Sequence, residues 1–265
     1  MQPLQIKNLT LGDGIPKICV PIVARDRQQL KTALNDLSGV PFDLAEFRAD
    51  HYAPLQELCL FAAHGRSGSL SRALVEVLAL IRQTVSDKPL LFTIRTKAEG
   101  GKVALSYGEY ETMLQSAAQT GYVDLIDVEL FTAGRNAAGL TEKLHSLQTK
   151  VIGSSHDFEK TPTEEKMLEC LLTMQSAGMD VTKLAVMPRS RKDVLSLLRV
   201  SCAMADGKAD RPFVTISMGD LGMTSRVCGS LTGSAITFAA AGRSSAPGQI
   251  DAAGMRQILD ILQAH

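Results

Sequence analysis

The alternation of strand-like and helix-like segments constrains the fold of this chain more than any other feature. Short apolar runs, typical of strands buried on both faces, are separated by segments whose apolar residues recur at helical spacing. Strict alternation of this kind implies a parallel sheet, and eight units in 265 residues favour a closed barrel over an open sheet. The eight expected strands cover residues 17–23, 42–47, 89–95, 123–128, 150–155, 183–187, 212–217 and 234–238.

We therefore predict an α/β fold, a single (β/α)8 TIM barrel that occupies residues 1–265 as one domain. Residues 4–15 alternate between apolar and polar and then reach a Gly-Asp-Gly sequence, which predicts an N-terminal β-hairpin that closes one end of the barrel. Two stretches rich in glycine and serine, residues 61–71 and 241–249, are predicted to be loops after the second and eighth strands.

Several helices are marked by their first turns. Capping boxes, in which a hydroxyl residue and an acidic residue three positions later satisfy the first backbone N–H groups, occur at Ser106–Glu109 and Thr161–Glu164. The second has proline at the first helical position, so we expect its helix to be capped by Thr161. Ser190–Asp193 opens a third helix. Further helices are expected over residues 72–85 and 255–264.

The composition narrows the range of partners. The chain has 28 basic and 28 acidic side chains and no net charge, which argues against nucleic acid or a membrane surface as an electrostatic partner. Its five cysteines are scattered without metal-ligand spacing, so we expect reduced thiols. We find no signal-peptide pattern and no apolar run long enough to span a bilayer, and we therefore expect a cytoplasmic protein.

A lysine, Lys183, heads the sixth apolar run. Burying an ammonium group on a strand covered on both faces is costly, so this lysine needs a specific reason to be there. One reading is an ion pair, for which Asp124, Asp127 or Glu129 could supply the carboxylate. The other reading is a nucleophilic amine that forms a Schiff base with a carbonyl substrate. The run alone leaves both readings open, and the ion pair is the more common.

In a barrel of this type, the carboxyl ends of the strands and the loops that follow them build the active site. Polar side chains expected there include Glu46, Arg48, Arg95, Glu99, His156, Lys183 and Arg226. A lysine can form an imine, a histidine can move the adjacent proton, and an arginine can bind a carboxylate with two hydrogen bonds. Each residue taken singly has an ordinary structural explanation, but the combination predicts a Schiff-base enzyme. No nucleotide, phosphate or metal motif accompanies it, so we predict neither cofactor nor metal.

At these residues the sequence resembles the type I 3-dehydroquinate dehydratases of the shikimate pathway. Each matching stretch is weak alone, but together they follow the order of the family from near residue 4 to the C-terminus. The matching stretches are Glu46–Arg48, Phe92–Arg95, Glu99–Gly101, Leu125–Glu129, Ser155–Phe158, Lys183–Pro188, Ser225–Arg226 and Ser245–Gln249.

The resemblance implies that the chain converts 3-dehydroquinate to 3-dehydroshikimate as a homodimer without cofactor or metal. Lys183 would form the imine with the ring ketone, and His156 would carry the neighbouring proton to the departing hydroxyl. Glu99 would hold His156 and tune its charge. The implied substrate-binding residues are Glu46, Arg48, Arg95, Arg226, Ser245 and Gln249. Among them, Arg226 would bind the substrate carboxylate, and the last two would lie in a loop that closes over it.

The sequence departs from the family at three places. Pro21 stands where some members have serine, Phe47 where tryptophan is frequent, and residues 231–234 read Leu-Thr-Gly-Ser in place of Val-Phe-Gly-Ser. None of these changes removes a catalytic group. Two other functions stay open: a different Schiff-base barrel enzyme such as a class I aldolase, and a barrel that binds a small acid without catalysis.

Overall fold

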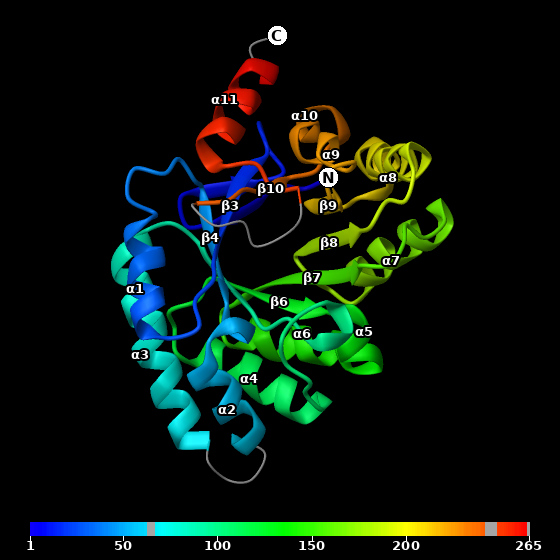
Figure 1. Cartoon of the computed structure of the whole chain (residues 1–265). Coiled ribbons are helices and arrows are strands. Elements are labelled where there is room, and N and C mark those ends of the chain that lie inside the picture. Colours follow the sequence, from blue (N-terminus) through cyan, green and yellow to red (C-terminus); the bar gives the residue numbers. More distant parts are fainter. Residues whose placement is uncertain (63–66, 242–247, 264–265) are drawn as a thin grey trace.

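The computed structural model describes residues 1–62, 67–241 and 248–263. Eight parallel strands form a barrel with helices around it (Figure 1). The strands are β3 (Lys17–Ile22), β4 (Leu44–Arg48), β5 (Leu90–Thr93), β6 (Leu125–Glu129), β7 (Lys150–Asp157), β8 (Val181–Val186), β9 (Phe213–Ser217) and β10 (Ile236–Phe238). All eight predicted strands are therefore confirmed, and their ends differ from the prediction by at most 2 residues.

Strands that follow one another in the chain are also neighbours in the sheet, in the order β10-β3-β4-β5-β6-β7-β8-β9. The two outer strands of this order meet where the N–H of Ala235 donates to the carbonyl of Phe213 at 2.8 Å. The sheet thus curls back on itself, as expected for a (β/α)8 barrel in which every strand runs in the same direction. The predicted fold class is confirmed.

The predicted hairpin is also present, ahead of the barrel. Strands β1 (Leu4–Ile6) and β2 (Leu9–Leu11) pair antiparallel, and Lys7 in the turn between them has a φ of 54°. Ile6 and Leu11 are buried, and they pack with side chains from the first residues of the barrel strands. The hairpin therefore closes the N-terminal end of the barrel and leaves the carboxyl ends of the strands for a site.

The helices lie outside the strands (Figure 1). They are α1 (Arg27–Asn35), α2 (Ala53–Ala62), α3 (Ser67–Val85), α4 (Tyr107–Gln119), α5 (Leu130–Ala133), α6 (Ala137–Ser146), α7 (Glu164–Ser176), α8 (Arg191–Ala203), α9 (Thr224–Val227), α10 (Gly229–Thr232) and α11 (Ala252–Gln263). Four single turns join them, η1 (Ala49–His51), η2 (Lys97–Glu99), η3 (Gly134–Asn136) and η4 (Met204–Lys208).

Helices α3 and α11 begin at Ser67 and Ala252, before the predicted residues 72 and 255, and one of the three predicted helix caps is wrong. Ser106 and Ser190 cap α4 and α8 as expected, each within a capping box. Helix α7, however, is capped by Thr163, two residues after the predicted Thr161. The hydroxyl of Thr161 donates instead to the carbonyl of Met187 at 3.1 Å. This bond ties the segment to the chain that follows β8, so the helix cannot begin at Thr161.

The loop predicted over residues 61–71 is also wrong in most of its length. Helix α2 ends at the start of this stretch, α3 begins at Ser67, and residues 63–66 lie outside the described residues. Leu70 and Leu74 of α3 are fully buried, so the apolar period of a helix prevails over the glycine and serine content. In the other predicted loop, residues 242–247 lie outside the described residues.

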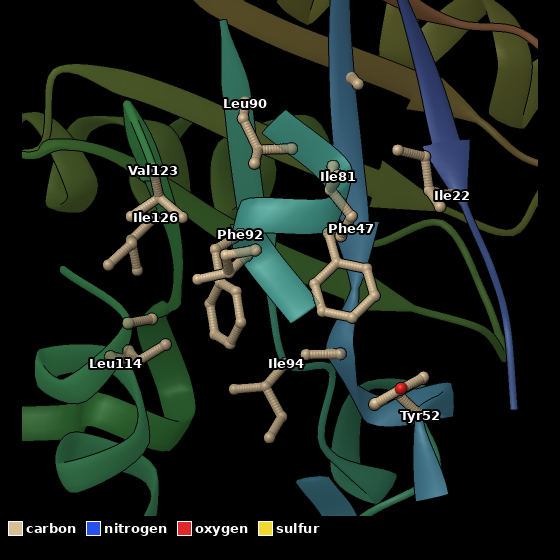
Figure 2. Packing of buried hydrophobic residues seen from close by; sticks show 14 of the residues in the cluster. Ile22, Phe47, Tyr52, Ile81, Leu90, Phe92, Ile94, Leu114, Val123 and Ile126 are labelled. Atoms are coloured by element: carbon tan, nitrogen blue, oxygen red, sulfur yellow. The ribbon is translucent and has the colours of Figure 1, made fainter. Parts of the chain in front are cut away.

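The barrel wall separates two apolar layers. Figure 2 shows part of the outer layer, where Phe47, Phe92 and Ile126 from the strands meet Ile81 and Leu114 from the helices. The rings of Phe47 and Phe92 lie 6.2 Å apart, so phenylalanine fills the position where tryptophan is frequent. A second layer fills the lower interior of the barrel. The upper interior is where the polar side chains gather.

Candidate active site

A cavity of about 170 Å³ opens at the carboxyl end of the barrel strands. Pockets for drug-sized ligands measure roughly 300–1,000 Å³, so this cavity suits a smaller molecule. The predicted site residues that line it are Glu46, Arg48, Arg95, Glu99, His156, Lys183, Arg226 and Gln249. Ser245, the remaining predicted residue, lies outside the described residues. Side chains from distant parts of the sequence therefore meet in one small site.

Lys183 is the third residue of β8 and is only 5% exposed. Its Nζ lies 3.8 Å from Oδ2 of Asp127 and 4.3 Å from the ring centroid of Phe238. Asp124 pairs elsewhere, with Arg82 at 2.7 Å. The lysine is thus both a member of an ion pair and part of the cavity lining, so the two readings of the sequence are compatible.

Arg95 connects the buried carboxylates beneath the cavity. Its Nη2 donates to Asp127 at 2.8 Å, and its Nη1 donates to Glu129 at 3.0 Å. Burial alone would raise the pKa of Asp127, but the positive charges of Arg95 and Lys183 hold it below its ordinary value. Asp127 therefore remains an anion beside Lys183. In this structure both terminal nitrogens of Arg95 bind protein carboxylates.

His156 and Glu99 form a dyad. Nδ1 of His156 lies 2.8 Å from Oε2 of Glu99, and both side chains are almost fully buried. Burial, opposed by Arg95, raises the pKa of Glu99 to about 8. Burial also lowers the pKa of His156 well below its ordinary value, with help from nearby cations including Lys183. The imidazole is therefore uncharged at neutral pH, which is the state a general base requires.

A tight turn brings Glu99 to the histidine. Glu99 ends the single turn η2, which begins four residues after the end of β5. The N–H of Gly101 donates to the carbonyl of Thr96 at 2.7 Å, so the chain doubles back onto the end of the strand. A Cβ at Gly101 would lie 1.8 Å from the carbonyl oxygen of Arg95, so only glycine fits there. The Glu-Gly-Gly sequence is thus a geometric requirement for the dyad.

Arg226 stands in the short helix α9 and is 3% exposed. Burial lowers the pKa of Arg226 to about 10, so the guanidinium keeps its charge at neutral pH. The neighbouring Ser225 hydroxyl accepts from the N–H of Ser217 and donates to the carbonyl of Gly222, at 2.9 and 2.8 Å. These bonds fasten the turn after β9, and they hold the arginine against the cavity.

Comparison with known proteins identifies the family. A family model described as type I 3-dehydroquinase matches residues 18–265. The chain belongs to this family. It is 42% identical over 262 residues to a 3-dehydroquinate dehydratase from Syntrophotalea carbinolica, covering 99% of this chain and 98% of that one. A 3-dehydroquinate dehydratase from Bacillus licheniformis is 40% identical over 259 residues, covering 98% and 97%.

A solved structure agrees with this assignment. It is a type I 3-dehydroquinate dehydratase from Clostridium difficile with covalently modified comenic acid, 39% identical with a TM-score of 0.90. The similarity covers 99% of this chain and 98% of that chain. The resemblance inferred from the sequence motifs is therefore confirmed at the level of the whole fold.

In this type I 3-dehydroquinase, Arg48 is held by an aspartate that we did not predict from the sequence. Its Nε and Nη2 donate to the two carboxylate oxygens of Asp50 at 2.8 and 2.9 Å. Asp50 is fully buried. Burial alone would raise the pKa of the Asp50 carboxyl group, but the Arg48 guanidinium holds that pKa below its ordinary value. His51 lies 3.3 Å from the same arginine and also lines the cavity. An aspartate two residues after a strand-end arginine is the signal that could have revealed this pair.

The described residues contain neither a group of metal ligands nor a membrane-spanning helix. Among them, we find no group of three or more His, Cys, Asp and Glu side chains arranged to hold a metal ion. No helix in the same part of the chain has the length and apolar character needed to cross a membrane.

Proposed function

We propose that this chain removes water from 3-dehydroquinate to give 3-dehydroshikimate in the shikimate pathway, through an imine on Lys183. The observation that carries the proposal is the placement of Lys183 and His156 on the neighbouring strands β7 and β8, facing one cavity. Membership of the type I 3-dehydroquinase family supplies the substrate. The aldolase and the non-catalytic barrel lack this support.

In the first stage, the amine of Lys183 attacks the ring ketone. The tetrahedral adduct then loses water, and the iminium that forms can accept electrons from the adjacent carbon. Before attack, the ammonium has to release a proton, because only the free amine is a nucleophile. Asp127 at 3.8 Å and the ring of Phe238 at 4.3 Å position Nζ for this step.

In the second stage, Nε2 of His156 takes the proton from the carbon beside the iminium, which leaves an enamine. The same nitrogen then returns a proton to the departing hydroxyl, and water leaves. Glu99 holds the imidazole through Nδ1, which leaves Nε2 to face the substrate. Hydrolysis of the product iminium by water restores Lys183.

The other polar groups of the cavity bind the substrate. Arg226 binds the carboxylate, since a guanidinium offers two parallel donors to that group. Glu46 accepts from the hydroxyl of Thr93 at 2.8 Å, which fixes its carboxylate for the ring hydroxyls. Arg48 and Arg95 contact the ring hydroxyls of the substrate and the part of the ring that reacts. Ser245 and Gln249 also bind the substrate, as the family resemblance implies, although Ser245 lies outside the described residues.

Two further proposals concern the setting of the enzyme. We propose that it works as a homodimer, which rests on the family resemblance alone. We also propose that it works in the cytoplasm. Its four described cysteines, at positions 19, 170, 202 and 228, are free thiols, which suits a reducing compartment.

A product assay tests the reaction. Purified protein is mixed with 3-dehydroquinate, and the products are followed by the ultraviolet absorbance of the conjugated enone and by proton NMR. We expect 3-dehydroshikimate from the wild type and none from Lys183→Ala. Carbon–carbon cleavage products would indicate an aldolase, and binding without turnover would indicate a non-catalytic barrel. Either result would overturn the proposal.

A further inference from the structure

A second cavity, of about 910 Å³, lies on the other side of the His156–Glu99 dyad. Glu99, Gly100, His156 and Phe158 line both this cavity and the active-site cavity. These four residues therefore form the wall between the two spaces. The ring of Phe158 lies against Gly100, where an added Cβ would come within 2.4 Å of it.

The second cavity lies outside the barrel wall. Ser155 and Leu184 line it, and they alternate along their strands with His156 and Lys183, which face the barrel interior. Its opposite side is formed by α7, through residues such as Cys170. The dyad thus has the substrate cavity in front of it and a separate space behind it.

One oxygen of Glu99 is not used by the protein. Oε2 binds His156, whereas Oε1 is buried and has no hydrogen-bond partner among the described residues. Buried carboxylate oxygens are nearly always bound by a protein donor or by an ordered water. Burial and the negative charge of Glu99 together raise the pKa of Cys170 to about 11, while the Ser155 hydroxyl lowers it. Glu99, Ser155 and Cys170 all line this cavity, where they offer a water the polar partners that it needs.

The rim of the second cavity is polar and open to solvent. Lys97, Lys160 and Lys166 line it and are exposed. The front cavity, in contrast, measures only about 170 Å³ and is occupied once substrate is bound. While substrate fills the active-site cavity, a proton can therefore reach or leave the dyad only through the second cavity.

We propose that the second cavity is a water-filled proton route, which connects the His156–Glu99 dyad with bulk solvent while substrate occupies the active site. The inference rests on the proposed function. When Nε2 of His156 accepts a proton, the Nδ1 proton passes to Glu99, and Glu99 releases one proton to water at its rear. Each transfer moves one proton and no electrons, and the reverse sequence brings a proton in. The route carries away the proton that the Lys183 ammonium releases before attack. The reverse sequence then delivers a proton from Nε2 to the hydroxyl of the tetrahedral adduct, which leaves as water, and this restores the Nδ1–H form of His156 for the second stage.

The test uses protein whose front cavity is permanently occupied. Borohydride reduction in the presence of 3-dehydroquinate attaches the substrate to Lys183, and the mass of the adduct is checked first. In this adduct, labelled with ¹⁵N-histidine, NMR measures how fast the ring N–H of His156 exchanges with water. Ala104→Trp places a large ring at the exposed mouth of the rear cavity, and Ala138→Trp makes the same change on the surface of α6, away from it.

We expect fast ring-proton exchange in the wild-type adduct, loss of that exchange in Ala104→Trp, and wild-type exchange in Ala138→Trp. Cys170→Phe, which fills the floor of the cavity, provides a second plug if the first is unsuitable. Slow exchange in the wild-type adduct, or equal exchange in plugged and control adducts, would overturn the proton route. Failure to form any adduct would instead overturn the proposed function, so the two failures are distinguishable.

Discussion

Replacing Glu99 with glutamine removes a buried carboxyl group whose pKa burial raises to about 8. Glutamine has nearly the same shape and can still accept the Nδ1–H bond that Glu99 shares with His156 at 2.8 Å. It cannot ionise, however. The variant therefore isolates the free energy of holding a charge at this position.

The size of the effect follows from the pKa. Burial raises the pKa of Glu99 from 4.5 to about 8. Each pKa unit corresponds to about 1.36 kcal/mol, so the ionisation of Glu99 should lower the free energy of unfolding by on the order of 3–5 kcal/mol. Because folding raises the pKa of Glu99, its carboxyl group contributes its full stabilisation at pH values below the pKa that it has in the unfolded chain. This stabilisation is lost as the pH rises through about 8. The free energy of unfolding of the wild type should therefore fall relative to Glu99→Gln between pH 5 and pH 9.

The assay is urea denaturation of both proteins at pH 5, 7 and 9, without ligand. Effects of pH on other groups cancel in the difference between the two unfolding free energies. We expect this difference to move in favour of Glu99→Gln by several kcal/mol across the range. A difference that changes by less than about 1 kcal/mol would show that Glu99 is ionised throughout, and it would refute the argument.

Three other substitutions test the site. His156→Ala should still form the imine on Lys183, seen as a borohydride-trapped adduct, but should dehydrate roughly 10²–10⁴-fold more slowly by product absorbance. Asp50→Asn should raise KM about tenfold, or about 1.4 kcal/mol, in steady-state kinetics, because Arg48 loses the charged partner that orients it. Arg226→Lys keeps the charge but loses the planar fork, so we expect a similar rise in KM with less change in kcat.

Each of these expectations has a contrary result. Normal turnover by His156→Ala would contradict its role in proton transfer. Asp260→Asn, on the exposed side of α11, is the matched control for Asp50→Asn. Equal KM values in these two variants would show that Asp50 does not position Arg48. If Arg226→Lys lowers kcat and leaves KM unchanged, the arginine acts in the chemical step and does not bind the substrate carboxylate.

Much of the fold was predictable because buried parallel strands are short continuous apolar runs. The run that contains Lys183 was recognised in this way, although β8 begins two residues earlier, at Val181. The helical errors have a different origin. Thr161 has the pattern of a helix cap, but its hydroxyl bonds to Met187, a residue distant in the sequence. Local patterns cannot report such tertiary competition.

The position of the site was predictable for a geometric reason. The carboxyl ends of parallel strands meet at one end of a barrel, so polar residues at several strand ends have to converge. The pairing among them was not predictable. Asp127 and Glu129 lie two residues apart on one strand face and both bind Arg95, yet of the two only Asp127 is also within 4 Å of Lys183. Small differences in how far each carboxylate reaches into the barrel decide which of them contacts Lys183. The amino-acid sequence does not contain that information.

We propose that Lys183 is the covalent centre of the reaction. The most direct test is to add borohydride together with 3-dehydroquinate, digest the protein and locate any added mass by mass spectrometry. We expect inactivation and one substrate-derived mass on Lys183, with none on the protein reduced without substrate. Folded protein that keeps its activity, or that carries the label only at another residue, would contradict it.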